Sequence, residues 1–67
     1  MKVKQGRHFK ITILNKTYYA VITHVNKDLF IIDFYRNGEF ETSKAVDSKF
    51  FKDNKEIIDW GISNGDN

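Results

Sequence analysis

Cysteine and proline are absent from the sequence, and glycine and histidine are scarce, with four and two residues. The lack of cysteine excludes disulfide bonds, and two histidines alone do not supply the usual ligands of a structural zinc site. The sequence has no run of 18 or more apolar residues, so it predicts no membrane span. Its first residues lack the apolar core of a signal peptide, and we therefore expect a cytoplasmic protein.

The chain is short, and its 67 residues predict one small domain over residues 1–67. Such a domain buries only about 60% of the surface that its unfolded chain exposes, so its stability margin is narrow. Without disulfides or a metal, a small domain depends on a dense core or on oligomerisation. Ten of the residues are aromatic, which predicts a dense core without a deep ligand cavity. We also expect a homo-oligomer.

The net charge is +2, but the charges are unevenly distributed along the chain. Residues 1–27 contain six basic residues and no acidic ones, whereas residues 28–67 contain five basic and nine acidic residues. Such asymmetry is typical of an anion-binding face or of head-to-tail self-association. It is equally consistent with a fold that interleaves the two halves and averages the charges, so the alternatives stay open.

Residues 7–43 show a β pattern, rich in isoleucine, valine, threonine, phenylalanine and tyrosine and interrupted by turn residues. Asn37-Gly38 is the strongest turn signal, because both residues tolerate the positive φ of a type I′ hairpin. We place two further turns at Asn15-Lys16 and at residues 26–28. The four strands are expected at residues 7–14, 17–25, 29–35 and 39–45.

The turn lengths set the strand registers. A two-residue loop at 15–16 pairs Ile11 with Ala20, and a three-residue loop at 26–28 pairs Ile22 with Ile32, so two independent turns place the apolar residues on one face. His24 is expected on this inner face as a partly buried residue. The inner face then consists of Phe9, Ile11, Ile13, Tyr18, Ala20, Ile22, Phe30, Ile32 and Phe34. The opposite face carries one row of Thr12, Tyr19, Tyr35 and Phe40, and a second row of Lys10, Val21, Asp33 and Thr42.

The last third of the chain changes character. Asp53 and Glu56 have the spacing of a capping box, which predicts a short helix over residues 54–60 that ends at Gly61. The alternative is a fifth strand over residues 57–62 that closes a small barrel. We expect the tail, residues 63–67, to be disordered.

The sequence thus predicts a mainly β fold: a four-stranded antiparallel meander or a small barrel, with a short C-terminal helix or a closing fifth strand. This order of elements is similar in layout to small SH3-like barrels, including chromatin- and RNA-associated ones. The similarity lies in the element order alone and identifies no functional residue.

Catalytic and metal-binding patterns are weak. Ser43, His24 and Asp33 can be written as a triad, but no nucleophile elbow accompanies them, and such sets occur by chance in most proteins. His8 and His24 lack the spacing and the partners of a metal site. The sequence has no glycine-rich phosphate loop. We therefore expect neither an enzyme nor a bound cofactor or metal.

The aromatic row on the outer face is the sharper candidate for function. Sheet-surface aromatics flanked by lysine or arginine stack bases and neutralise phosphates in several small β domains. The candidate ligand-binding residues are Lys10, Tyr19, Tyr35, Arg36 and Phe40, with further charge from the basic N-terminal hairpin. The competing interpretation is structural: the C-terminal segment packs on the row, and Trp60 and Ile57 bury it.

Two functions follow from this pattern. The first is a non-catalytic module that binds an anionic ligand, either nucleic acid or a nucleotide. The alternative is a small phage- or plasmid-type inhibitor that binds a host protein or sequesters a signalling nucleotide as an oligomer. Tyrosine and phenylalanine on a flat sheet are typical anchors of protein interfaces as well, so the row itself is compatible with both.

Overall fold

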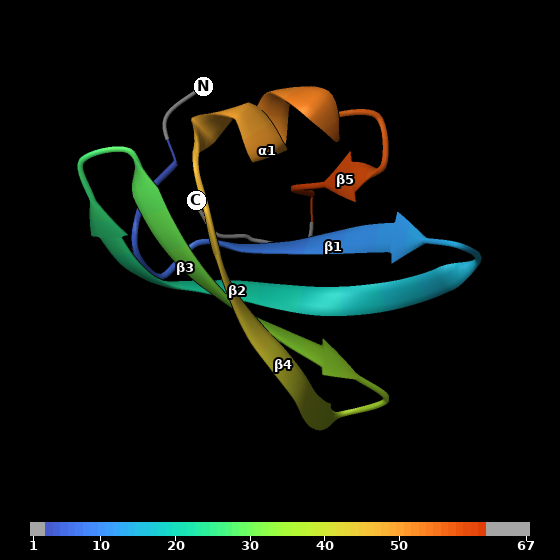
Figure 1. The fold of residues 1–67 in the computed structure, drawn as a ribbon. Helices are drawn as coiled ribbons and strands as arrows, with labels where there is room; N and C mark the ends of the chain where they lie inside the picture. The colour runs from blue at the N-terminus through green and yellow to red at the C-terminus, as the bar shows by residue number, and fades with distance from the viewer. Residues whose placement is uncertain (1–2, 62–67) are drawn as a thin grey trace.

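The computed structural model describes residues 3–61, which form one antiparallel sheet and one short helix (Figure 1). The elements are β1 (His8–Ile13), β2 (Lys16–Asn26), β3 (Leu29–Arg36), β4 (Glu39–Val46), α1 (Ser48–Asp53) and β5 (Ile58–Asp59). The strand order is β4-β3-β2-β1-β5, so four strands form a meander and β5 extends it at β1. The predicted mainly β fold is confirmed. The tail that we expect to be disordered lies outside the described residues.

The first hairpin turns one residue earlier than the sequence predicts. Its loop consists of Leu14 and Asn15, with φ of 50° and 67°, whereas the expected loop was Asn15-Lys16. The β1–β2 register therefore shifts by two, and Ile11 pairs with Tyr18. Because side chains alternate with a period of two along a strand, this shift keeps every side chain on its predicted face.

The second hairpin has a two-residue loop rather than the predicted three, 26–28. Ile22 nevertheless pairs with Ile32 as predicted, because a β-bulge between Ile22 and His24 absorbs the extra residue. In the part of β2 that follows the bulge, each side chain lies on the sheet face opposite to the predicted one. His24, predicted on the inner face, is therefore exposed, and Val25 packs against the core in its place.

The third hairpin confirms the strongest turn signal of the sequence. Asn37 and Gly38 form its loop with φ of 55° and 81°, the left-handed conformation that a type I′ turn requires. In the β3–β4 ladder, Tyr35 pairs with Phe40 and Phe34 pairs with Thr42, so Glu41 has no partner residue and forms a second β-bulge. Bulges increase the local twist, and in Figure 1 the β3–β4 hairpin crosses the β1–β2 hairpin at a steep angle.

The core lies on the inner face of the sheet, as the sequence predicts. Tyr18 is only half-buried, and Ile13 is 40% exposed, because it lies at the end of β1 beyond the two residues that pair with β5. Phe51 of α1 and Ile58 of β5 complete the core. The other seven predicted inner residues are buried: Phe9, Ile11, Ala20, Ile22, Phe30, Ile32 and Phe34.

The helix begins six residues earlier than predicted, since α1 ends at Asp53 instead of beginning there. Phe51 of α1 packs on Phe9 and Phe30, with ring centroids 6.1 and 5.1 Å apart. Burial of this ring outweighs the local capping-box signal at residues 53–56, because tertiary packing overrides local propensity. The alternative, a fifth strand over residues 57–62 that closes a barrel, is confirmed only as the short strand Ile58–Asp59. It extends the sheet at β1 and leaves β4 as the other edge, so the sheet is open.

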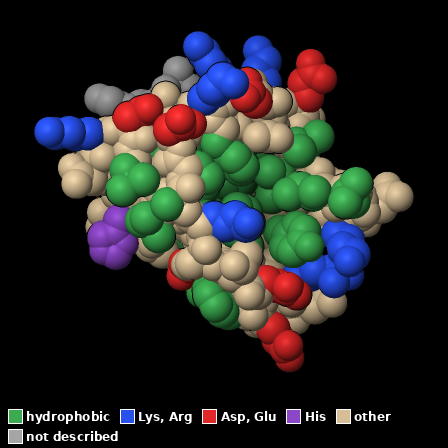
Figure 2. Space-filling view, viewed as in Figure 1, with side chains coloured by type: hydrophobic (Ala, Val, Ile, Leu, Met, Phe, Trp, Pro, Cys, Tyr) green, Lys and Arg blue, Asp and Glu red, His purple; other side chains and the backbone are tan. Residues whose placement is uncertain are grey.

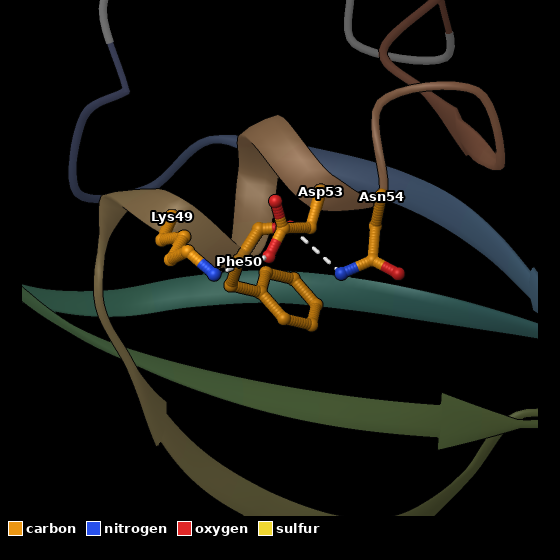
Figure 3. A network of polar contacts seen from close by, with 4 residues as sticks. All are labelled: Lys49, Phe50, Asp53 and Asn54. Atoms are coloured by element: carbon orange, nitrogen blue, oxygen red, sulfur yellow. Dashed lines mark hydrogen bonds and ion pairs between the residues drawn. The ribbon is translucent and has the colours of Figure 1, made fainter.

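Polar contacts stabilise the last turn of α1 (Figure 3). The Asn54 side-chain amide donates a hydrogen bond of 2.7 Å to the carbonyl oxygen of Phe50, and so does its backbone N–H, at 3.1 Å. The Lys49 ammonium lies 3.2 Å from the Asp53 carboxylate. The side-chain amide is thus a second donor to a carbonyl that the Asn54 backbone N–H already satisfies, whereas the exposed ion pair contributes little.

Candidate ligand-binding face

Four of the five predicted site residues lie in one cross-strand row on the outer face. Lys10 pairs with Tyr19, Tyr19 with Tyr35, and Tyr35 with Phe40. The row crosses the meander from β1 to β4. The sequence predicts Thr12 in this row and Lys10 in the next, but the two-residue shift of the first hairpin brings Lys10 into it. A cation therefore lies directly beside the first ring.

The described elements leave this face open. Phe40 is 58% and Tyr19 is 40% exposed, and Tyr35 is half-buried. Trp60, which follows β5, packs against Phe9 on the inner side, with ring centroids 4.9 Å apart. The interpretation that the C-terminal segment buries the aromatic row is therefore wrong for residues up to 61.

Two edge-to-face ring pairs flank a shallow hollow on the outer face. The His8 and Tyr19 rings lie 5.3 Å apart, and the His8 Nδ1 is hydrogen-bonded to the Tyr19 hydroxyl. The Tyr35 and Phe40 rings lie 5.9 Å apart at 76°. Between these pairs, an open hollow of about 440 Å³ is lined by Tyr19, Val21, Tyr35 and Gly38. It offers two phenol rings and an aliphatic side chain to a planar ligand.

Carboxylates outnumber ammonium groups among the described charges of this face. Lys10 is exposed and pairs in register with Asp59, whose carboxylate accepts a hydrogen bond of 2.9 Å from the Gly61 N–H. In the next row, the Asp33 carboxylate accepts a hydrogen bond from the Ser43 hydroxyl. One ammonium beside two carboxylates does not make a strongly positive surface, so the face is mainly aromatic in character.

Arg36 does not join the row, although the sequence predicts it as a site residue. It is the last residue of β3 and pairs with Glu39 across the third turn. Because side chains alternate along a strand, Arg36 projects to the opposite face from Tyr35. The structure thus brings the three aromatic residues and one of the two predicted cations together.

The basic residues of the N-terminal segment are dispersed as well. The Arg7 guanidinium lies over the Trp60 ring, 4.6 Å from its centroid. Lys16 is the first residue of β2, which is 11 residues long, and Lys27 directly follows its last residue. Arg7, Lys16 and Lys27, among the described basic residues of this segment, therefore do not join Lys10 at the aromatic row.

The remaining sequence candidates do not form a reactive centre. Ser43 bonds directly to Asp33, while the His24 Nδ1 lies 3.3 Å from the Thr23 hydroxyl, so histidine does not bridge serine and aspartate as a triad requires. Within residues 3–61, no three histidine, aspartate or glutamate side chains gather as metal ligands would. The helical part of this region is also too short to cross a membrane.

Two residues of the face are missing from the sequence prediction of the site, His8 and Val21. Each lies two positions along its strand from a predicted row member, His8 from Lys10 and Val21 from Tyr19, so alternation alone places both on the outer face. Their pairing with each other depends on the β1–β2 register, which the misplaced first turn obscures.

Comparison of this chain with protein-family models, curated proteins and solved structures finds no match. The functional argument therefore depends on the geometry of the chain itself. Within residues 3–61, that geometry consists of an open aromatic row, a shallow hollow within it, and one neighbouring cation.

Proposed function

We propose that this chain is a non-catalytic binding module that stacks the bases of single-stranded nucleic acid, or of a free nucleotide, on its outer face. The observation that carries the proposal is the uncovered row of Lys10, Tyr19, Tyr35 and Phe40. A cytoplasmic location, as the sequence predicts, suits a protein with this ligand.

The dimensions of the row support this ligand class. Neighbouring strands lie about 4.8 Å apart, so three rings on adjacent strands extend over roughly 10 Å. Sheet aromatics in RNA-binding domains stack two or three bases in this way. Each stacked base contributes about 1–3 kcal/mol, largely independent of its identity. We therefore expect two or three nucleotides to be bound with little sequence preference.

The charge balance favours single strands over a duplex. Duplex binding without base readout depends on many lysine or arginine contacts to phosphate, whereas Lys10 is the one such residue that residues 3–61 bring to this row. The faces of paired bases are also hidden inside a duplex, whereas a single strand can present them to Tyr19 and Tyr35. Stacking should supply most of the affinity, and one phosphate contact should set the salt dependence.

Fluorescence anisotropy with labelled single-stranded DNA, single-stranded RNA and a matching duplex tests the proposal, and calorimetry with mononucleotides tests the free ligand. We expect binding of the single strands and little binding of the duplex. The logarithm of the affinity should fall with the logarithm of salt concentration with a slope of about −0.7, as for one phosphate contact. Phe40→Ala should weaken binding by about 1–3 kcal/mol and leave the melting temperature nearly unchanged, because Phe40 is largely exposed.

Two lysines provide a matched control. Lys10 lies on the outer face, whereas Lys44, which is exposed as well, pairs with Ile32 on the inner side. Lys10→Ala should weaken binding and flatten the salt dependence, and Lys44→Ala should change neither. Equal effects of the two variants would contradict the proposed site. Failure of the wild-type chain to bind any oligonucleotide or nucleotide would refute the proposal and favour a protein ligand.

A further inference from the structure

Asp33 is an unusual residue for the middle of a sheet. It lies in the interior of β3, which is paired on both sides, between the buried residues Ile32 and Phe34. On the side that α1 covers, hydrophobic side chains gather in the band that Figure 2 shows between α1 and the β3–β4 hairpin. Because side chains alternate along a strand, Asp33 projects to the opposite, outer face. Aspartate is depleted in strands, so this position requires an explanation.

Asp33 lies beside the hollow of the candidate site. Its cross-strand partner on β2 is Val21, and Tyr35 follows it two positions along β3. Val21 and Tyr35 both line the hollow. Neighbours on the same face of a strand are roughly 6.8 Å apart, which leaves room for half the width of a base and one hydrogen bond of about 2.9 Å. A base that stacks on the Tyr35 ring can therefore turn its edge to the Asp33 carboxylate.

The Asp33 carboxylate is oriented by one contact and still able to accept others. Its Oδ1 accepts a hydrogen bond from the Ser43 hydroxyl on β4, whereas its Oδ2 has no protein partner within residues 3–61. A carboxylate has about four acceptor sites, so Oδ1 keeps a free site as well. Because Asp33 is half-buried, it has lost part of its hydration, and donors on a ligand would compensate for that loss.

Guanine fits two neighbouring acceptor oxygens better than the other common bases do. Its Watson–Crick edge presents two adjacent donors, the N1–H and the amino group at C2, which match a carboxylate as the two parallel donors of a guanidinium do. Adenine and cytosine have a ring-nitrogen acceptor next to the amino group, and thymine and uracil have a carbonyl oxygen on each side of the N3–H. Each of those edges directs an acceptor at the second carboxylate oxygen, so only guanine satisfies both oxygens.

We propose that Asp33 makes the outer face selective for guanine at one nucleotide position, where its carboxylate accepts hydrogen bonds from the N1–H and the amino group of a base stacked on Tyr35. This inference rests on the proposed function and deepens it. Stacking itself gives little preference among the bases, and Asp33 adds a preference at the position beside it. The base donors also explain a carboxylate on this face, since its charge repels the phosphates of the same ligand.

Fluorescence anisotropy with labelled DNA pentanucleotides that differ only in the central base tests this inference. With thymine at the other positions, a central guanine should bind at least about fivefold more tightly than adenine, cytosine or thymine, which is the lower limit for a bidentate contact to a base. Hypoxanthine lacks the amino group of guanine and should lose most of this preference. Calorimetry with guanosine monophosphate distinguishes a free nucleotide from a strand as the source of the guanine.

Two aspartates of the outer face provide matched variants of similar shape. Asp33→Asn removes the charge but can still accept a hydrogen bond from Ser43, whereas Asp59→Asn removes a carboxylate on the edge strand β5, where it pairs with Lys10. Each variant removes one negative charge from the face, so neither should weaken binding of the all-thymine strand. Only Asp33→Asn should abolish the guanine preference, because an amide nitrogen, itself a donor, then faces the guanine donors.

The outcomes separate this inference from the proposed function. Equal affinity for all central bases would refute the guanine preference and leave stacking intact, whereas failure to bind any single strand would refute both. A preference that survives Asp33→Asn, or that Asp59→Asn abolishes as well, would overturn the role of Asp33. Trp60 fluorescence shows whether the variants fold. If Asp33→Asn did not fold, Ser43→Ala at an exposed position would decide the question, since it should reduce the guanine preference without changing the affinity for the all-thymine strand.

Discussion

Replacement of Ile32 by alanine tests the assignment of the two sheet faces. Ile32 and its cross-strand partner Ile22 are both 0% exposed. Ile32→Ala removes three carbon atoms, and at about 0.8 kcal/mol per buried methylene the lost transfer free energy is roughly 2.4 kcal/mol. The cavity that remains adds to this, so we expect a loss of about 2–5 kcal/mol in the free energy of unfolding.

The size of this loss sets the design of the experiment. A chain of 67 residues has a total stability of about 3–10 kcal/mol, so Ile32→Ala is expected to be only marginally folded. Ile32→Val, which removes one methylene and should cost about 0.5–1.5 kcal/mol, provides a second point. Urea unfolding followed by the fluorescence of Trp60, the single tryptophan, measures both variants. A fixed protein concentration is needed, since dimerisation would shift the midpoint.

Ile31 provides the matched control for this prediction. It is the neighbouring residue of the same type, but it is half-buried and pairs with His24 on the outer face. Ile31→Ala leaves no enclosed cavity and loses only part of the transfer term, about 1 kcal/mol. If Ile31→Ala destabilised the chain as much as Ile32→Ala, the inner and outer faces would be wrongly assigned.

Three further predictions concern the turns, the helix end and the tryptophan. Gly38→Val should lower the free energy of unfolding by about 1–3 kcal/mol because φ is 81°, whereas Gly38→Asn should lower it much less. Thermal unfolding compares the two variants, and equal losses would argue against a left-handed turn. Asn54→Ala should lower the free energy of unfolding by about 1 kcal/mol because it removes the side-chain hydrogen bond at the end of α1. Lys49→Ala should lower it by less than about 0.5 kcal/mol. Urea unfolding measures both variants, and the reverse order would contradict the capping role of Asn54. Arg7→Gln should change the emission of Trp60 and lower stability by about 0.5–2 kcal/mol; an unchanged spectrum would show that the guanidinium does not lie on the ring.

The sequence predicts the four strands of the meander well because alternation and turn chemistry agree there. The observed strands begin and end within one residue of the predicted ranges, and Asn37-Gly38 turns where its backbone preferences require. The first turn is misplaced because Leu14 occupies a left-handed position that sequence rules reserve for asparagine or glycine. An error of two residues in the β1–β2 register leaves each side chain on its correct sheet face but changes its cross-strand partner. For that reason the rings of the row are predicted correctly, and the position of Lys10 in it is not.

The C-terminal region is predicted less well because its structure depends on distant contacts. The capping-box spacing of Asp53 and Glu56 is a local signal of about 1 kcal/mol. Burial of an aromatic ring such as that of Phe51 contributes more, but its partners Phe9 and Phe30 are far away in the sequence. Which face of the sheet this segment covers also depends on those contacts. That choice decides whether the aromatic row is core or surface, and the sequence alone leaves it open.

The ten aromatic residues are divided between the core and the outer face of the sheet. Seven of them lie in the core or pack against it: Phe9, Tyr18, Phe30, Phe34, Phe50, Phe51 and Trp60. The other three, Tyr19, Tyr35 and Phe40, share one row on the opposite face, which no described element covers. In a domain with a narrow stability margin, each large ring left outside the core forgoes a substantial part of the available burial. Three such rings in register, beside Lys10, therefore support the proposal that a ligand stacks on them.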